Sequence, residues 1–277
     1  MRATIGMRML GVLAGCLLGL VAAGLAVGQQ TEEQQAPPTL PTPEPAPGTT
    51  VPEPAKRELG LDERADIFMA RKAYADAVDY YNRALAATGR TNPALLNKLG
   101  IAHQQQLDYR RARKAYKEAT KRDKTFAEPW NNLGTTYYLQ DKPGKSLKYY
   151  RQAIKLNPKG ASFHINLGTS YYRMKNISQA IEEWSTALAL DPNVLKDRST
   201  LGTVVQARGT DVKFYFYMAK VFASLGRAEE AVRYLRRAFE DGFDDLKLLE
   251  EDPDFKKISQ FPAYIELRAN PPKPIKE

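Results

Sequence analysis

Residues 127–160 read AEPWNNLGTTYYLQDKPGKSLKYYRQAIKLNPKG, and this stretch decides the fold. Ser146, Tyr150 and Ala153 stand at positions i, i+4 and i+7, so their side chains share one face of a helix. The small residues let a neighbouring helix approach closely, and the aromatic ring fills the space beside them. The sequence DKPG at 141–144 is a turn signal. The stretch therefore predicts two antiparallel helices joined by a short turn.

The same pattern recurs along the chain with a period of 34 or 35 residues. Its last small residue is Ala84, Ala119, Ala153 or Ala187, and three residues earlier stands Tyr81, Tyr116, Tyr150 or Trp184. A Leu-Gly pair recurs upstream at 99–100, 133–134 and 167–168. A further unit has Ala231, Leu235 and Ala238 in the same roles. Its pattern follows that of the preceding unit after 51 residues instead of 34. One helical hairpin cannot bury its apolar face alone, so such units are expected to stack into a solenoid.

These residues resemble the tetratricopeptide repeat (TPR) family, of the exported bacterial type, over roughly 58–245. The resemblance implies an all-α fold, a right-handed superhelical solenoid of antiparallel helix pairs. We expect about five units in a solenoid spanning 56–245, at 58–92, 93–126, 127–160, 161–194 and 212–245. An irregular insertion is expected at 195–211, C-terminal capping helices at 246–269 and a loose tail at 270–277.

The N-terminal residues predict an export signal. Arg2 and Arg8 are followed by an uncharged run at 9–27, and the small residues at its end suit a signal peptidase, which predicts a signal peptide at 1–28. Two alternatives remain: the run is long enough to anchor the chain in a membrane, and Cys16 follows a lipobox-like sequence that would direct lipidation. Each places the chain in the periplasm or cell envelope.

Residues 29–55 predict a disordered linker between this signal and the repeats. They hold eight of the 18 prolines and four acidic residues, with no basic residue. Such a composition cannot bury enough apolar surface to fold, and its prolines favour an extended chain reaching roughly 80 Å.

Several kinds of chemistry are disfavoured by composition. Cys16 is the only cysteine, and His103 and His164 are the only histidines. A disulfide within the chain, a cysteine zinc site and a histidine cluster are therefore excluded. No glycine-rich phosphate loop or nucleophile elbow is present in the sequence. We expect no enzyme activity, no cofactor and no metal, and we interpret both histidines as packed helix residues.

TPR arrays generally bind other proteins, and the resemblance places the first helix of each unit along a concave groove. The groove candidates are Asn97, Asn131, Asn132, Tyr138, Asn166, Tyr172, Arg173, Lys213 and Phe216. Asparagine amides can pair with a peptide backbone, and the aromatic rings offer rigid apolar contact area. The predicted function is a non-enzymatic scaffold or adaptor that binds a peptide or helix of a partner protein. The alternative that these residues serve only packing and solubility remains open.

The strongest cluster of charge lies on a different predicted helix. Its cations are Arg110, Arg111, Arg113, Lys114, Lys117 and Lys121. Alanines at 112, 115 and 119 face the core, so the cations are expected on the convex side. They form either a solvated face or a docking surface for an anionic membrane or polymer. In the second case the chain would be a membrane-anchored envelope assembly factor. An exported chain is not expected to bind nucleic acid.

Overall fold

The computed structural model describes residues 58–196 and 213–275. The chain divides into two units, 1–55 and 56–277, and every described residue belongs to the second. The predicted signal peptide or anchor (1–28), the linker (29–55), most of the insertion (195–211) and the end of the tail therefore lie outside the described residues.

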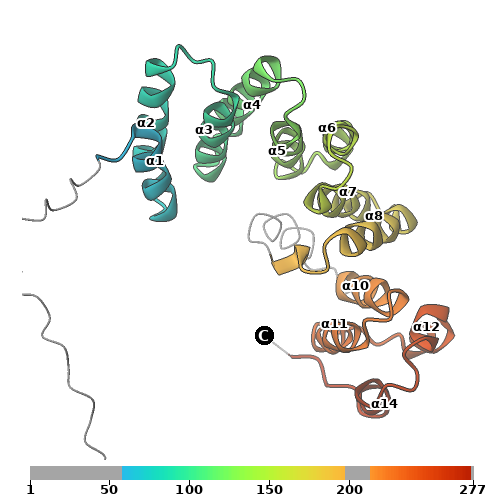
Figure 1. Ribbon diagram of the computed structural model, residues 1–277. Helices are drawn as coiled ribbons and strands as arrows, with labels where there is room; N and C mark the ends of the chain where they lie inside the picture. Colours follow the sequence, from blue (N-terminus) through green and yellow to red (C-terminus); the bar gives the residue numbers. More distant parts are fainter. Residues whose placement is uncertain (1–57, 197–212, 276–277) are drawn as a thin grey trace, which may run out of the picture. The chain divides into compact units, whose positions relative to one another are not determined.

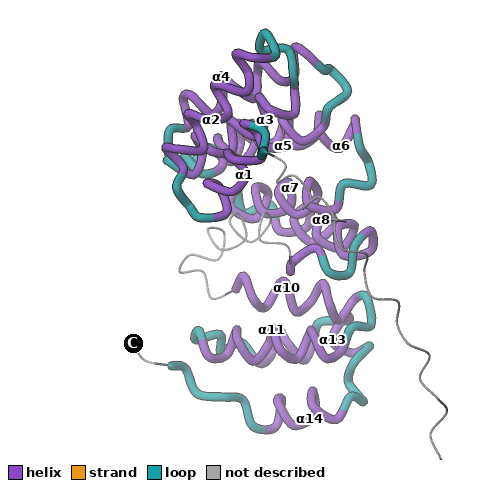
Figure 2. Tube along the Cα trace, turned by 60° about the vertical axis from the view of Figure 1, so that its left-hand side comes forward, coloured by secondary structure: helices purple, strands orange, loops and turns teal. Residues whose placement is uncertain are grey.

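All regular secondary structure of the described residues is helical, as Figures 1 and 2 show, which confirms the all-α fold. The helices of the repeats are α1 (Leu61–Ala70), α2 (Tyr74–Ala87), α3 (Pro93–Gln105), α4 (Tyr109–Arg122), α5 (Ala127–Tyr138), α6 (Pro143–Leu156), α7 (Ala161–Arg173), α8 (Ile177–Leu190), α10 (Lys213–Ser224) and α11 (Ala228–Glu240). The short 3₁₀ helix η1 (Val194–Lys196) follows α8, and α12 (Leu246–Glu251), α13 (Pro253–Lys256) and α14 (Pro262–Ala269) follow α11. None of these helices is long and apolar enough to cross a bilayer.

The helices pack as successive hairpins, which confirms the predicted stack of five units. Each odd helix from α1 to α7 packs on the even helix that follows it, and α10 packs on α11. The second helix of each of the first three units also packs on the first helix of the next unit (Figure 1). In addition, α5 touches both α3 and α7. The first helices of the second, third and fourth units therefore form a common face.

The core consists of the small and aromatic residues that define the repeat. In α6, Ser146, Tyr150 and Ala153 are fully buried, and the corresponding residues of the other units are buried too. Gly134 in α5 lies against the Tyr150 ring: a Cβ atom added there would stand 2.7 Å from Tyr150 Cε1. The Leu-Gly pair thus recurs because the glycine admits the ring of the second helix.

The turn inside each hairpin uses the same backbone conformation in all five units. Lys72, Leu107, Asp141, Lys175 and Gly226 have φ angles of 60°, 61°, 56°, 62° and 72°. Each stands 12 residues before the last small residue of its unit. A left-handed φ is unfavourable for any residue except glycine, so four of the five turns carry a local strain that helix packing must offset.

The fifth unit joins the stack despite the displaced register. Helix α10 packs on α8, and the Phe214 ring lies 5.4 Å from the Tyr172 ring and 5.6 Å from the Trp184 ring. The expected insertion is described only at its start, in η1.

Short helices cover the end of the fifth unit, which confirms the predicted cap. Helix α13 packs against α10 and α14 packs against α11. Asp252 caps α13, accepting a hydrogen bond from the Asp254 N–H at 2.9 Å, and it also pairs with Lys220 of α10. In the tail, the Ile275 N–H donates to the Glu240 carbonyl at 2.9 Å, so at least this residue is held against α11.

Candidate interaction surfaces

Four predicted asparagines meet on the common face of α3, α5 and α7, which we call the Asn face (Asn97, Asn131, Asn132 and Asn166). Asn132 Nδ2 donates to Asn97 Oδ1 at 2.9 Å, and Asn166 Nδ2 donates to Asn131 Oδ1 at 2.9 Å. Asn131 Nδ2 donates to Asn132 Oδ1 at 3.3 Å. The four amides therefore form one hydrogen-bonded row across three repeat units.

A shallow pocket of about 270 Å³ lies over this row. Its lining is Asn97, Ile101, Gln104, Gln105, Glu128, Asn131, Asn132, Thr135, Ser162, Phe163 and Asn166. Asn97 and Asn166 are buried, whereas Asn131 and Asn132 are half-buried and accessible. An amide nitrogen has two hydrogens and an amide oxygen two lone pairs, so Asn131 and Asn132 can bind a guest while keeping their bonds in the row.

The prediction that three aromatic rings lie open in the groove is wrong. Tyr138 is 3% exposed, Tyr172 2% and Phe216 1%. Tyr138 and Tyr172 belong to the interior where neighbouring units meet, and Tyr172 packs on Trp184. Phe216 is covered because a capping helix, α13, packs on α10 there, with Phe255 5.5 Å from the Phe216 ring. These rings stabilise the stack and offer no free contact area.

Two predicted cations of this set are exposed at helix ends. Arg173, at the end of α7, donates to Asp141 Oδ1 at 2.6 Å, and this hydrogen bond raises the pKa of its guanidinium. Lys213, the first residue of α10, is also exposed. Neither belongs to the row of asparagines or to the lining of its pocket.

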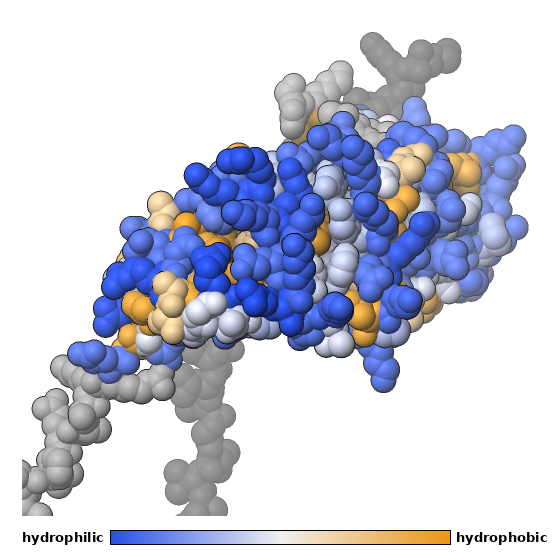
Figure 3. Space-filling model, turned by 90° about the horizontal axis from the view of Figure 1, so that it is seen from above, coloured by the Kyte–Doolittle hydropathy of each residue, from blue (hydrophilic) through white to orange (hydrophobic). Residues whose placement is uncertain are grey.

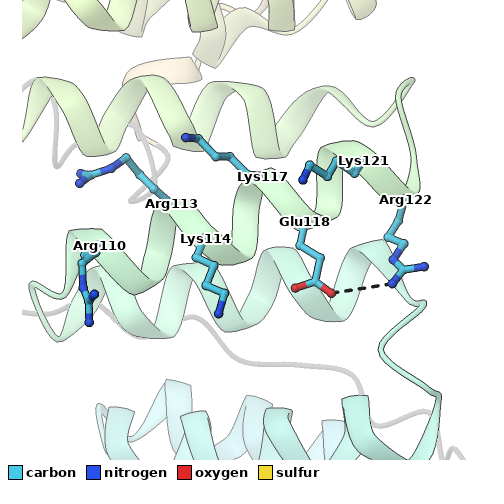
Figure 4. Close-up of a pocket in the computed structure, with 7 residues that line it drawn as sticks. All are labelled: Arg110, Arg113, Lys114, Lys117, Glu118, Lys121 and Arg122. Atoms are coloured by element: carbon cyan, nitrogen blue, oxygen red, sulfur yellow. Dashed lines mark ion pairs between the residues drawn. The ribbon is translucent and has the colours of Figure 1, made fainter.

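The predicted basic residues project from α4, as expected (Figure 4). Arg111 pairs with Asp108 at 3.2 Å, and Arg113 donates to Gln140 Oε1 at 2.6 Å. Within the described residues, five of the six cations form no ion pair, namely Arg110, Arg113, Lys114, Lys117 and Lys121. Glu118 is the one acid in the middle of α4, and it pairs with Arg90 and Arg122.

Helix α6 carries further cations that are not among the predicted basic residues. Lys148, Arg151 and Lys155 stand 34 residues after Lys114, Lys117 and Lys121, so they occupy the same outward positions of the next unit. The repeat register was the signal that could have identified them. In α8 these positions hold Glu182, Ser185 and Ala189, and in α2 they hold Asp79, Asn82 and Ala86. We call these six cations, together with Arg110 near the start of α4, the outer cations: Arg110, Lys114, Lys117, Lys121, Lys148, Arg151 and Lys155.

The outer cations belong to a segment that holds all the excess positive charge of the repeats. Residues 109–181 contain 16 basic and four acidic residues, a net charge of +12, whereas 56–277 as a whole has 39 basic and 28 acidic residues, a net of +11. The molecular face in Figure 3 is largely hydrophilic, with small hydrophobic areas between the polar side chains.

Both histidines are packed residues, as the sequence analysis interpreted them. His164 is 9% exposed, its Nδ1 lies 2.7 Å from Glu183 Oε2, and this hydrogen bond raises its pKa. His103 is 8% exposed, and burial lowers its pKa. Among the described residues, no three acidic, histidine or cysteine side chains gather in a way that could hold a metal ion.

Comparison with known proteins gives matches to two repeat models and similarity to several solved structures. Residues 127–159 and 161–194 match two family models, each described as a tetratricopeptide repeat. No curated protein matches the sequence.

Among solved structures, MamA is 22% identical, with 64% of this chain and 93% of that chain covered and a TM-score of 0.45. TTC0263, a TPR protein of Thermus thermophilus, is 19% identical over 74% of this chain and 97% of that chain, with a TM-score of 0.47. YrrB, a TPR protein described as having an unusual peptide-binding site, is 15% identical over 69% and 89%, with a TM-score of 0.43.

Proposed function

We propose that this chain, whose residues 127–159 and 161–194 match tetratricopeptide repeat models, is a non-enzymatic scaffold that binds an extended segment of a partner protein on the Asn face. The observation that carries the proposal is the row of hydrogen-bonded asparagines that lines a pocket spanning α3, α5 and α7. A peptide backbone needs donors and acceptors at regular intervals, and amide side chains supply both. The row recognises a backbone whatever its side chains are.

Photo-crosslinking in the cell tests this proposal. A photoreactive amino acid is placed at Ser162, in the lining of the pocket, and in a control at exposed Glu229 of α11. We expect adducts with a partner protein at position 162 that do not form at position 229. The double variant Asn131→Ala with Asn132→Ala should weaken binding of that partner about tenfold or more, since each lost hydrogen bond is worth about 1 kcal/mol. The proposal fails if the adducts are the same at both positions, or if the double variant binds with unchanged affinity.

The proposed place of action is the cell envelope, reached through residues 1–28. The support is the sequence pattern of two arginines, an uncharged run and small residues. Intact mass of the protein from fractionated cells distinguishes the alternatives: a chain beginning near Gln29 is cleaved, a full-length chain is anchored, and added acyl mass on Cys16 shows lipidation. A full-length chain in the cytosolic fraction would refute export.

A second candidate function is docking of the chain on an anionic membrane through the outer cations. What favours it is the confinement of the excess positive charge to 109–181, together with an N-terminal run that would hold the chain at the membrane. Each lysine or arginine near an anionic bilayer contributes about 1 kcal/mol. Flotation with phosphatidylserine vesicles is expected to carry the wild type, and the triple variant Lys114→Glu, Lys117→Glu, Lys148→Glu is expected to remain behind. Reversal of exposed Lys247 on α12 is the matched control.

A further inference from the structure

A pocket of about 320 Å³ opens between the second helices of the first two units, on a different face of α3 from the asparagine row. Leu99 and His103 of α3 and Ala115 of α4 form its floor, and all three are buried. The complete lining is Val78, Asn82, Arg90, Leu99, His103, Arg111, Lys114, Ala115 and Glu118. The pocket therefore has an apolar floor and a largely basic rim.

The next unit shows what fills this space when the repeat is complete. There the rings of Tyr137 and Tyr149 stack, with 5.2 Å between centroids and 7° between planes. The Arg113 guanidinium lies over the Tyr137 ring at 5.1 Å. Tyr137 and Tyr149 stand 34 residues after His103 and Ala115. The pocket thus lies where the next unit has two stacked tyrosine rings. At these two positions it has only the imidazole of His103 and the methyl group of Ala115.

The cation over the stack is also missing from the pocket. The residue that corresponds to Arg113 is Val78, 35 residues earlier, so an apolar side chain lies where the guanidinium covers the ring in the next unit. The wall and floor consequently suit an aromatic ring, because Ala115 stands where the next unit has the Tyr149 ring. Burial of such a ring is favourable by about 25 cal/mol per Å² of apolar area.

The polar atoms around the pocket define the rest of its chemistry. His103 Nδ1 is buried and has no hydrogen-bond partner among the described residues. Burial lowers the pKa of the His103 imidazole and so favours its neutral form. On the rim, Lys114 has no ion pair among the described residues, whereas Glu118 is already held by Arg90 at 3.7 Å. Carboxylates beside a bound ring would therefore meet an uncompensated cation.

We propose that this pocket binds an aromatic side chain, preferably tyrosine, from an acidic segment of a partner protein. The ring takes the place that Tyr149 occupies in the next unit, and the flanking carboxylates contact Lys114 and its basic neighbours. Charge complementarity selects an acidic segment, and the shape of the neighbouring stack selects a ring. This contact lies outside the Asn face and adds a second binding site to the scaffold.

The two histidines make the proposal directly testable by proton NMR on the full chain. His103 lies in the pocket, and His164 is an internal control because it is held by Glu183 in another unit. The probe is the capped peptide Asp-Glu-Tyr-Glu-Asp, titrated to about 5 mM because a single-ring contact is expected near a Kd of 1 mM. The ring current should shift the His103 imidazole signals and leave those of His164 in place. The peptide with alanine for tyrosine should bind about tenfold more weakly or not at all.

Two variants complete the test. Ala115→Tyr restores the stack of the next unit and should abolish the His103 shift. Lys114→Glu leaves the buried floor intact and should weaken binding severalfold, so it decides the question if the tyrosine variant does not fold. Equal shifts with the tyrosine and alanine peptides, or no shift of His103, would overturn the proposal. Binding of free 4-hydroxyphenylacetate as strong as that of the peptide would also overturn it, because the site would then be one for small aromatic acids.

Discussion

The contact between Gly134 and Tyr150 allows the close packing of the repeat to be tested by adding one methyl group at position 134. Gly134→Ala places a Cβ atom 2.7 Å from the Tyr150 ring, and that ring cannot move aside because it is fully buried. Overpacking of this kind costs about 1–3 kcal/mol. Alanine in a helix interior regains up to about 1 kcal/mol relative to glycine. We therefore expect a net loss of about 1–2 kcal/mol.

Gly144, near the start of α6, provides the matched control. A Cβ atom there would meet only Met174, at 3.9 Å, which is ordinary van der Waals contact. Gly144→Ala should leave the stability unchanged or raise it by a few tenths of a kcal/mol. The assay is urea unfolding followed by far-ultraviolet circular dichroism. With a slope of about 2 kcal/mol per M, the Gly134→Ala midpoint should fall by about 0.5–1 M.

A double-mutant cycle identifies the cause of the loss. In a Tyr150→Leu background the ring is absent, so the cost of Gly134→Ala should shrink by about 1 kcal/mol or more, as is usual for residues in contact. A Gly134→Ala midpoint equal to that of Gly144→Ala, or an undiminished cost without the ring, would refute the close-packing explanation.

Three further perturbations test other parts of the structure. The hydrogen bond from Glu183 raises the pKa of His164, so its stabilisation is complete below the unfolded pKa near 6.5 and is lost as the pH rises through the folded pKa. The urea midpoint of the wild type should thus fall between pH 6 and pH 8 more than that of Glu183→Gln, and parallel pH profiles would contradict this. Leu107 has a left-handed φ of 61°, which glycine adopts without steric cost. Leu107→Gly should therefore raise the free energy of unfolding by about 0.5–1 kcal/mol, measured by thermal unfolding. A lower midpoint would show that the turn is not strained. Asp252→Ala removes the cap of α13 and the partner of Lys220, and it should cost about 2–4 kcal/mol and speed hydrogen exchange in 253–269 more than in α3.

The repeat core was predictable because its residues report on local geometry. Ser146, Tyr150 and Ala153 define one helix face by spacing alone, and recurrence of the pattern fixes the partner of that face. The register also explains why the asparagines meet: residues 35 positions apart, such as Asn97 and Asn132, lie in corresponding places on neighbouring helices.

Exposure of the aromatic candidates was not predictable in the same way. Whether Phe216 lies open depends on which element packs on α10, and a cap that departs from the repeat pattern decides this. The pocket at His103 was not predicted either. It arises because two residues, one on each helix of the unit, have smaller side chains than the corresponding residues of the next unit.

The outer cations have a consequence for how proteins of this architecture diverge. Their positions lie on the solvent side of α4 and α6, and corresponding positions of α2 and α8 hold acidic or neutral residues without any change in the helical hairpin. Mutations there alter the electrostatic potential of one unit while the buried residues stay the same. Selection can therefore tune the surface of each unit independently, and two proteins with the same interior can acquire different docking preferences.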